Sequence, residues 1–387
     1  MSRASEAAGW GLSAPVRSLL LTACAAHAAY ATLLLRPQLA DLPLNQLPML
    51  QAHDTGTSYL RASSAITDVL YRFTRTQDAD NVTMLLDCGA RSFDWRPSLT
   101  GGVLGFAHGP VFINHSMEAA AAEVVAWAGA HAAQAEDALV LLNVADCNSD
   151  ACNAEALAAF ARVGLPAVAG QGCVAASDYT LGAAMAAAAL PGGGHALALL
   201  NCPGAPTDTY DDRRSCTGFF NVTQGEAFEA EVAACLAAPS AAEALACIEA
   251  AAGLADLPDH YACYTDGSGR NASWPLQRLQ EWVFATASVA PPSAPGQRGL
   301  LVSLQGCWAQ NVQSTVLSFL HDSSLVLDEA RAGFNLGPLL QWIPTLPHVS
   351  QVGMNAVCHG GLEVLAALRQ RLGRGATQVD KDPMTML

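Results

Sequence analysis

The chain has 387 residues, of which 51% are hydrophobic and only 14% charged, and its formal net charge at pH 7 is −15. This length and composition allow a large core and argue against an intrinsically disordered protein. The acidic balance argues against nucleic acid as a partner, because binding the phosphate backbone requires clustered basic residues. It also disfavours adhesion to anionic lipid through bulk charge, so an anionic substrate would need a local cationic pocket.

The first 35 residues have the pattern of a targeting segment. Arg3 and Arg17 precede an apolar run over 19–35, and small residues near Ala29 and Ala31 offer a cleavage site. Residues 1–35 are therefore predicted to be a signal peptide, with a retained signal anchor as the alternative. Residues 376–387 are predicted to form a polar tail, because they do not resemble a hydrophobic anchor.

Cysteine usage fits the same export route. Cys24 lies in the leader, which leaves eleven of the twelve cysteines, and metal-type Cys-x-x-Cys pairs are absent. Cysteines close in sequence are Cys147 with Cys152, Cys202 with Cys216, and Cys235 with Cys247 and Cys263. Sequons begin at Asn81, Asn114, Asn221 and Asn271. We expect a secreted or luminal glycoprotein with disulfide bonds, whose connectivity the sequence leaves open.

Apolar runs of strand length alternate with Ala-rich segments from residue 47 onward. Strands are predicted at 47–52, 83–87 continuing into 91–95, 138–144, 165–169, 196–201, 299–305 and 348–355. Helices are predicted at 118–133, 154–163, 179–190, 226–252 with a break at Pro239, 275–287 and 362–372. This alternation predicts an α/β fold whose parallel sheet is covered on both faces, either a closed barrel or an open sheet. No G-x-G-x-x-G follows the first strand, so dinucleotide binding has no support.

Three charged clusters fall at or just after predicted strand ends, at 51–57, 87–96 and 106–109. In a barrel the carboxyl ends of the strands converge on one face, so His53, Arg96 and His108 can meet there. Two imidazoles and a guanidinium suit phosphoryl transfer, since one His can take a proton, the other can give one, and Arg can hold the phosphoryl oxygens. Judged by spacing alone, a His after an apolar strand is more often a turn residue than a catalyst, and Arg96 could be a surface-loop residue.

The order and spacing of these motifs resemble the X-domain of phosphatidylinositol-specific phospholipase C and its bacterial and X-domain-only relatives. The matching elements are His53-Asp54-Thr55-Gly56, Thr76-Gln77, the run from Leu86 to Arg96 (Leu-Asp-Cys-Gly-Ala-Arg-Ser-Phe-Asp-Trp-Arg) and His108-Gly109. The resemblance implies a distorted (β/α)8 TIM-type barrel over 40–375. A disulfide-stapled insertion at about 203–296 would extend it beyond the compact bacterial enzymes.

The resemblance also implies catalytic roles in phosphodiester cleavage. His53 would be the general base on the inositol 2-hydroxyl, and His108 the general acid for the diacylglycerol oxygen. Arg96 would stabilise the pentacoordinate phosphate, and Asp54 would orient Arg96 or His108. Because calcium-dependent relatives carry an acidic residue where Arg96 stands, neither a metal nor another cofactor is expected.

Four further residues are expected to contact the substrate, namely Asp94, Asp146, Asn355 and His359. The relatives fix the base histidine with a late carboxylate, whereas the residue aligned here is Asn355, a neutral amide that supports an imidazole cation less well. The expected partners are a phospholipid or other phosphodiester, such as an inositol phospholipid or a glycosyl-phosphatidylinositol, and the membrane surface that presents it.

Two alternatives stay open from the sequence. One is a catalytically weak or inactive barrel that binds phosphoinositide or glycan headgroups, which the altered final strand favours. The other is the glycerophosphodiesterase or sphingomyelinase D branch of the same barrel, which would need acidic metal ligands after the second strand beyond Asp94.

Overall fold

The computed structural model describes residues 37–61, 71–72, 74–109, 111–132, 139–145, 147–202, 303–305, 307–309, 323–332, 335–345 and 350–379, and single positions at 234, 243, 247, 262 and 263. The predicted leader 1–35 and residues 380–387 of the predicted tail lie outside the described residues. Apart from those single positions, so do the predicted insertion at about 203–296 and its helices at 226–252 and 275–287.

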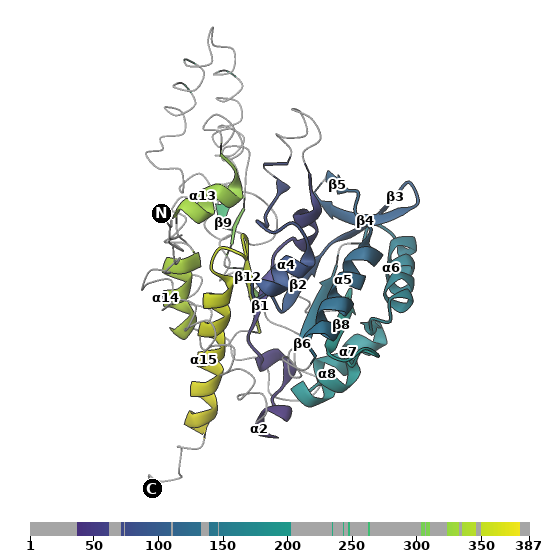
Figure 1. The fold of residues 1–387 in the computed structure, drawn as a ribbon, viewed down its shortest axis with the longest axis vertical. Coiled ribbons are helices and arrows are strands. Elements are labelled where there is room, and N and C mark those ends of the chain that lie inside the picture. Colours follow the sequence, from purple (N-terminus) through teal and green to yellow (C-terminus); the bar gives the residue numbers. More distant parts are fainter. Residues whose placement is uncertain are drawn as a thin grey trace, which may run out of the picture.

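Seven parallel strands form the central sheet (Figure 1). Their order is β10 (Ser303–Gln305), β12 (Gln351–Met354), β1 (Met49–Ala52), β2 (Ser92–Trp95), β6 (Leu139–Val144), β8 (His195–Leu200) and β7 (Ala167–Ala169). Every neighbouring pair is parallel, which confirms the predicted α/β class. Among the described residues β10 and β7 end the sheet without pairing to each other, so closure into a barrel stays a prediction.

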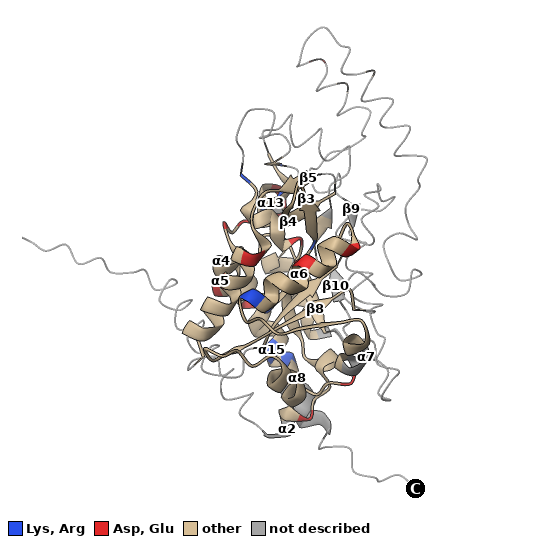
Figure 2. Ribbon diagram, turned by 90° about the vertical axis from the view of Figure 1, so that its right-hand side faces the viewer, with Lys and Arg blue, Asp and Glu red and all other residues tan. Residues whose placement is uncertain are grey.

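Both faces of the sheet are buried, which explains the unbroken apolar runs. Along β6, Val140 and Leu142 belong to one core and Leu139 and Leu141 to another, because successive side chains point to opposite faces. The first core includes α4 (Val82–Asp87), α5 (Met117–Ala130), α6 (Asp150–Arg162) and α15 (Gly361–Val379). The second includes α2 (Pro37–Ala40), α7 (Gln171–Ser177) and α8 (Leu181–Ala187). Charged residues are scattered over both helices and loops (Figure 2).

Side-chain caps decide where the helices begin. Ser116, Ser149 and Thr180 each accept a hydrogen bond from the backbone N–H three residues later, so α5, α6 and α8 start at Met117, Asp150 and Leu181. The helix predicted from residue 154 therefore begins four residues earlier. The closing helix α15 continues to Val379, beyond the predicted end at 372.

The strand predicted at 83–87 is wrong, because this segment is helix α4. Asn81 caps the helix by accepting a hydrogen bond from the Met84 N–H at 2.8 Å. Val82, Leu85 and Leu86 are buried at helical spacing, i, i+3 and i+4. Over so short an apolar run, periodicity alone does not separate a helix from a strand.

A second, antiparallel sheet follows β2 and was not predicted. It consists of β3 (Pro97–Thr100), β4 (Val103–His108) and β5 (Val111–Ile113), with Gly101 and Gly102 at positive φ in the first turn. The third charged cluster, 106–109, therefore lies at the end of β4 and not after a strand of the parallel sheet. The remaining described elements are η1 (Leu44–Gln46), η2 (Thr55–Tyr59), β9 (Ala262–Cys263), β11 (Trp308–Ala309), α13 (Leu325–Ala332), η6 (Asn335–Leu339), α14 (Leu340–Trp342) and η7 (Ile343–Thr345).

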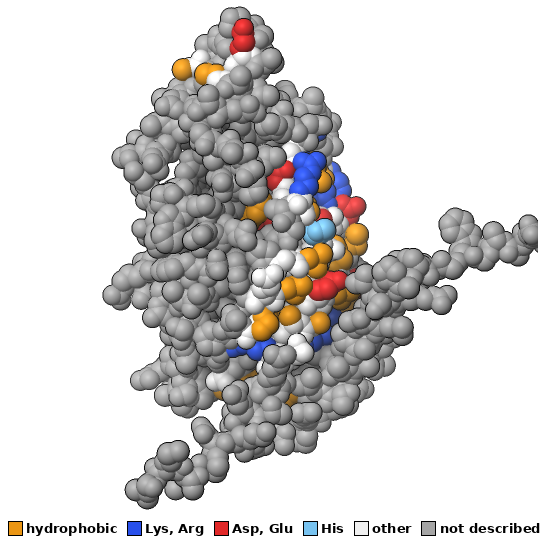
Figure 3. Space-filling view, turned by 90° about the vertical axis from the view of Figure 1, so that its left-hand side faces the viewer, with side chains coloured by type: hydrophobic (Ala, Val, Ile, Leu, Met, Phe, Trp, Pro, Cys, Tyr) orange, Lys and Arg blue, Asp and Glu red, His pale blue; other side chains and the backbone are white. Residues whose placement is uncertain are grey.

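The described helices do not include one that combines the length and the apolar character needed to cross a bilayer. Exposed large hydrophobic side chains are single residues on several elements, including Met84, Val103 and Leu157. On the face shown in Figure 3, hydrophobic side chains are interspersed with acidic and basic ones.

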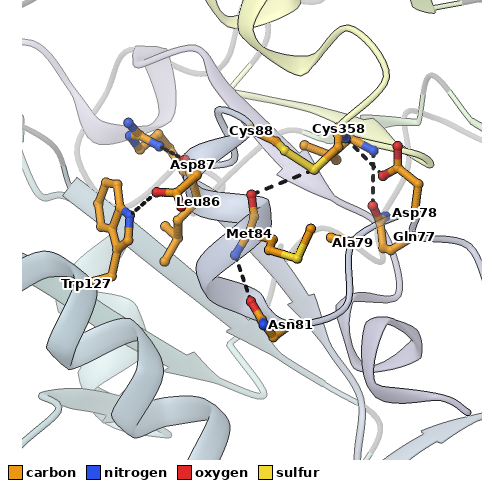
Figure 4. The surroundings of a disulfide bond; sticks show 12 residues. Gln77, Asp78, Ala79, Asn81, Met84, Leu86, Asp87, Cys88, Trp127 and Cys358 are labelled. Carbon is orange, nitrogen blue, oxygen red and sulfur yellow. Dashed lines mark hydrogen bonds between the residues drawn. A yellow bond between two sulfur atoms is a disulfide. The ribbon is translucent and has the colours of Figure 1, made fainter.

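Three disulfide bonds join described residues. Cys147–Cys152 links two cysteines that are close in sequence. Cys202 pairs with Cys173 and not with Cys216, because Cys173 and Cys202 follow the neighbouring strands β7 and β8. The bond between Cys88 and Cys358 joins the end of α4 to the loop between β12 and α15, with Cα atoms 4.8 Å apart (Figure 4).

Loss of the Cys88–Cys358 bond is expected to destabilise the fold more than loss of Cys147–Cys152. The two bonds span sequence separations of 270 and 5 residues. Loop entropy makes the difference about 3.5 kcal/mol in the free energy of unfolding. Urea denaturation of the two double Cys→Ala variants measures it, and equal losses would contradict the prediction.

Candidate active site

Strand register brings three of the predicted residues to one face of the sheet. Ala52 is paired with Phe93 on one side and with Met354 on the other. The residue after β1 is His53, and the residues that follow Phe93 and Met354 are Asp94 and Asn355. Because alternate residues share a face, these three side chains lie on the side opposite the Phe93 core, at the carboxyl ends of the strands.

The same face changes character along the strands. Near the amino ends it is apolar, with Met49, Leu139 and Leu197 in the second core. Midway it carries buried amides and a hydroxyl, where Asn143 Nδ2 and Gln351 Nε2 both donate to Ser92 Oγ at 2.7 Å. The chemically reactive groups follow only at the carboxyl ends, so the apolar and amide layers separate the site from the amino-terminal edge.

Asp54 is the centre of the site. It follows His53 with a left-handed backbone (φ 44°), which Asp tolerates better than most residues, and its side chain is 1% exposed. Its Oδ2 lies 3.2 Å from His53 Nε2 and 3.1 Å from His108 Nε2, and its Oδ1 lies 2.7 Å from Arg96 Nε. One buried carboxylate thus contacts all three basic side chains predicted to act together.

Burial by itself raises the pKa of the Asp54 carboxyl. The positive charges of Arg96, His108 and His53 outweigh this effect and lower the pKa to about 2, from an ordinary value of 3.8. Asp54 is therefore ionised throughout the range in which the protein would work.

Arg96 bridges two carboxylates. In addition to Asp54, its Nη2 donates to Asp94 Oδ2 at 2.9 Å and lies 3.5 Å from His53 Nε2. Asp94 Oδ2 also accepts the backbone N–H of Asp54 at 3.2 Å. The guanidinium side chain is 18% exposed, so it keeps a solvent-facing edge that an anionic ligand could contact.

The antiparallel sheet carries His108 into the site. The backbone N–H of Ala107 donates to the carbonyl of Arg96 at 2.8 Å, which fixes β4 beside the end of β2. Gly56 permits this approach, because a Cβ at that position would lie 2.5 Å from the Phe106 Cβ. The glycine of the His-Asp-Thr-Gly motif therefore makes room for the strand that bears His108.

The two imidazoles have different hydrogen-bond partners. His108 Nδ1 lies 2.7 Å from the carbonyl oxygen of Thr74, an acceptor only, so Nδ1 carries a hydrogen. Its other nitrogen faces the Asp54 carboxylate, and a protonated ring donates to both. His53 Nδ1 lies 2.9 Å from Asn355 Oδ1, and the ring is 2% exposed.

The orientation of the Asn355 amide decides the His53 tautomer. Asn355 Nδ2 donates to the carbonyl of Trp308 at 2.8 Å and to Glu329 Oε2 at 2.9 Å, so Oδ1 faces His53. His53 Nδ1 must then carry the hydrogen, which leaves Nε2 as the nitrogen able to accept a proton.

The Thr76-Gln77 motif holds the ends of β1 and β12 together. Gln77 Nε2 donates to the carbonyls of His53 and Met354, at 2.7 and 2.9 Å, and its Oε1 accepts the Val357 N–H at 3.2 Å. Thr76 Oγ1 adds a bond to the His53 carbonyl at 3.1 Å. This motif therefore holds His53 and Asn355 in register and does not itself supply a catalytic group.

Arg91, the other arginine of the Leu86–Arg96 run, is structural. It is 5% exposed, its Nη1 donates to the carbonyls of Leu86 and Ala90, and it stacks over Trp127 at 4.8 Å. Arg91 and Arg96 are five positions apart, so period-2 alternation places them on opposite faces, and only Arg96 follows the end of β2.

One predicted substrate contact, His359, is not part of this cluster. Asp146 lies outside the described residues. His359 is half-buried and lies near Asp78, on whose carboxyl group it acts electrostatically. Its expected contact with the substrate remains a prediction.

Glu329 on α13 was missed from the sequence, although it is completely buried against Asn355. The only available signal was its helical spacing from the buried Leu325, four residues earlier. That spacing marks an inward-facing position but says nothing of its partner.

Among the described residues, His53, Asp54 and Asp94 offer donor atoms within 4.8 Å of one another, close enough to share a cation. Arg96 already makes an ion pair with each of the two carboxylates. A guanidinium in this place supplies positive charge to the same spot that a metal ion would.

The chain resembles a solved structure at low sequence identity. No protein-family model matches the chain, and no curated protein matches it. Among solved structures, the chain is similar to the phosphatidylinositol-specific phospholipase C from Listeria monocytogenes, at 12% sequence identity and a TM-score of 0.43, over 88% of this chain and 97% of that chain. A likeness of this degree says nothing about activity, so the chemistry has to come from the site residues.

Asp54→Asn is expected to remove a pH-dependent part of the stability. Because the pKa of about 2 lies below the ordinary 3.8, ionised Asp54 stabilises the fold above about pH 4, and this contribution is lost as the pH falls toward 2. The gap in unfolding free energy between wild type and Asp54→Asn should shrink by about 2 kcal/mol from about pH 5 to about pH 2.

Urea denaturation at both pH values measures this gap. Exposed Asp150, replaced in the same way, is the matched control, whose gap to wild type should stay nearly constant. A gap that does not change for Asp54→Asn would show that its carboxylate is not the ionised centre of the cluster.

Proposed function

We propose that this chain is a phosphodiesterase that cleaves an inositol phospholipid or a glycosyl-phosphatidylinositol by acid–base catalysis. One observation carries the proposal. His53 Nε2 and His108 Nε2 approach the same oxygen of Asp54, at 3.2 and 3.1 Å, with Arg96 bound to the other oxygen. Two proton-transfer groups beside a guanidinium fit a phosphodiester whose cleavage takes a proton from the attacking hydroxyl and gives one to the leaving ester oxygen.

His53 is the proposed general base. Asn355 holds its Nδ1–H, so the Nε2 lone pair is the group that can take a proton from the inositol 2-hydroxyl. Arg96 Nη2, 3.5 Å away, is close enough to hold a phosphoryl oxygen beside that nitrogen.

His108 is the proposed general acid. It is less buried than His53, and as an imidazolium it donates from Nδ1 to Thr74 and from Nε2 toward Asp54. The Nε2 proton is the one that a leaving oxygen would receive. Asp54 would hold His108 and Arg96 in place, as the motif resemblance implied.

The reaction balances without another reagent. The 2-hydroxyl oxygen bonds to phosphorus and gives its proton to His53, while the bond from phosphorus to the glycerol oxygen breaks and that oxygen takes the proton of His108. The products are diacylglycerol and a cyclic inositol phosphate. With the two histidines now in reversed protonation states, water can open the cyclic ester.

We propose that this activity takes place outside the cytosol, at a membrane surface. Three disulfide bonds among the described residues suit an oxidising compartment. The net charge of −15 would weaken attraction to anionic lipid, so we infer that headgroup contacts at the site, and not bulk charge, select the substrate.

His53→Ala and His108→Ala are each expected to lower kcat by about a thousandfold, because each removes one proton-transfer group. Release of water-soluble inositol phosphate from labelled phosphatidylinositol vesicles measures this. His131→Ala is the matched control, since His131 stacks on Trp127 and bonds to its carbonyl. Wild-type protein that binds the vesicles without releasing product would overturn catalysis and favour a headgroup-binding barrel.

Activity is expected to persist in EDTA, because Arg96 supplies the positive charge beside the phosphate. Arg96→Lys should instead lower kcat by roughly a hundredfold, since an ammonium cannot pair with Asp54 and Asp94 while holding a phosphoryl oxygen. The same release assay, with and without EDTA, measures both effects. Loss of activity in EDTA, restored by added calcium, would show that a metal ion takes part.

A further inference from the structure

A buried hydrogen-bonded chain continues from His53 away from the proposed substrate side. His53 Nδ1–H donates to Asn355 Oδ1 at 2.9 Å, and Asn355 Nδ2–H donates to Glu329 Oε2 at 2.9 Å. His53 is 2% exposed, and both Asn355 and Glu329 are 0% exposed. The carboxyl group of Glu329 therefore lies on the far side of Asn355 from His53, with one amide between them.

The geometry points to Glu329 as a positioning residue for His53 that acts through Asn355 and supports the positive charge that the ring gains when it takes a proton from the substrate. This inference rests on the proposed function of His53. Glu329 reaches the reacting groups through the Asn355 amide, not by a contact of its own with the substrate.

The physical basis is polarisation of the amide. When the acceptor of Nδ2–H is anionic, electron density shifts toward Oδ1, and Oδ1 becomes a stronger acceptor for the His53 N–H. In a dry interior this effect is little screened. The neutral amide beside His53 thus gains part of the character of a carboxylate.

The surroundings of Glu329 control when this support is present. Burial raises its pKa to about 8, even though hydrogen bonds from Asn355 and the Trp308 N–H act in the opposite direction, and the nearby Asp78 raises it further. Among the described residues, the Cys307 thiol also faces Glu329, and burial raises the pKa of that thiol well above 9. Glu329 therefore becomes ionised as the pH rises through about 8, while Cys307 keeps its proton.

Glu329→Gln tests the inference because it keeps the shape and removes the charge. At about pH 6.5 its kcat should equal that of wild type, and at about pH 9 it should be about tenfold lower, with KM unchanged at both. Asp328→Asn is the matched control. It removes the neighbouring buried carboxylate of α13, which contacts Ser323 and Arg331, and its kcat ratio to wild type should not vary with pH.

A second measurement needs no substrate. The proton resonance of His53 Nδ1–H, assigned by its absence in His53→Gln, should move downfield in wild type from about pH 6.5 to about pH 9, as Glu329 ionises and the hydrogen bond strengthens. In Glu329→Gln it should stay in place. A wild-type resonance that does not move over this range overturns the inference, even if Glu329→Gln fails to fold.

A rescue variant separates charge from packing. Asn355→Asp in the Glu329→Gln background places a carboxylate directly on His53 Nδ1, and the amide introduced by Glu329→Gln can donate to that carboxylate. The kcat of this double variant at about pH 9 should return to the wild-type value. If Glu329→Gln matches wild type at every pH while His53→Ala is inactive, the inference fails and the proposed function stands. If wild type releases no product, the proposed function fails, and the resonance still tests the link between Glu329 and His53.

Discussion

The buried carboxylate of Asp54 is the constraint on which the rest of the site depends. Isolated in a dry interior, such a charge would be strongly unfavourable, and here three cationic or protonatable groups surround it. Those groups come from three different places: the residue before Asp54, the end of β2 and the end of β4. The cluster can form only when the parallel sheet and the antiparallel sheet β3–β5 are both folded. Its contribution to stability therefore depends on both sheets.

Acceptors remote from Asp54 differentiate the two histidines. His108 meets a backbone carbonyl, whose acceptor character never changes. His53 meets an amide whose own donors are committed to Trp308 and Glu329. Since both rings share the same carboxylate oxygen, it is these Nδ1 partners that would distinguish the proposed base from the proposed acid. The partner of His53 is also the adjustable one, because its strength depends on the charge of Glu329.

Two sets of contacts hold Asn355 in place. Gln77 bonds to the carbonyls at the ends of β1 and β12, and the Cys88–Cys358 bond fastens the loop that follows Asn355 to the end of α4. Between them they fix the distance from the amide to the imidazole. Gly56 has a comparable role on the other side of the site, where it lets Phe106 and β4 approach.

The sequence by itself determined the local parts of this protein. Its apolar runs predicted the parallel sheet, and its linked motifs singled out His53, Asp54, Arg96 and His108, because strand character and motif spacing are properties of neighbouring residues. Local sequence pattern was not enough for two other elements. The five-residue run 83–87 forms helix α4 and not a strand, and the antiparallel sheet β3–β5 was not predicted. Only the tertiary structure decided that Glu329 lies behind Asn355 and that Cys88 meets Cys358, 270 residues apart. Such contacts depend on which strands pair and in which register, and no local pattern encodes that choice.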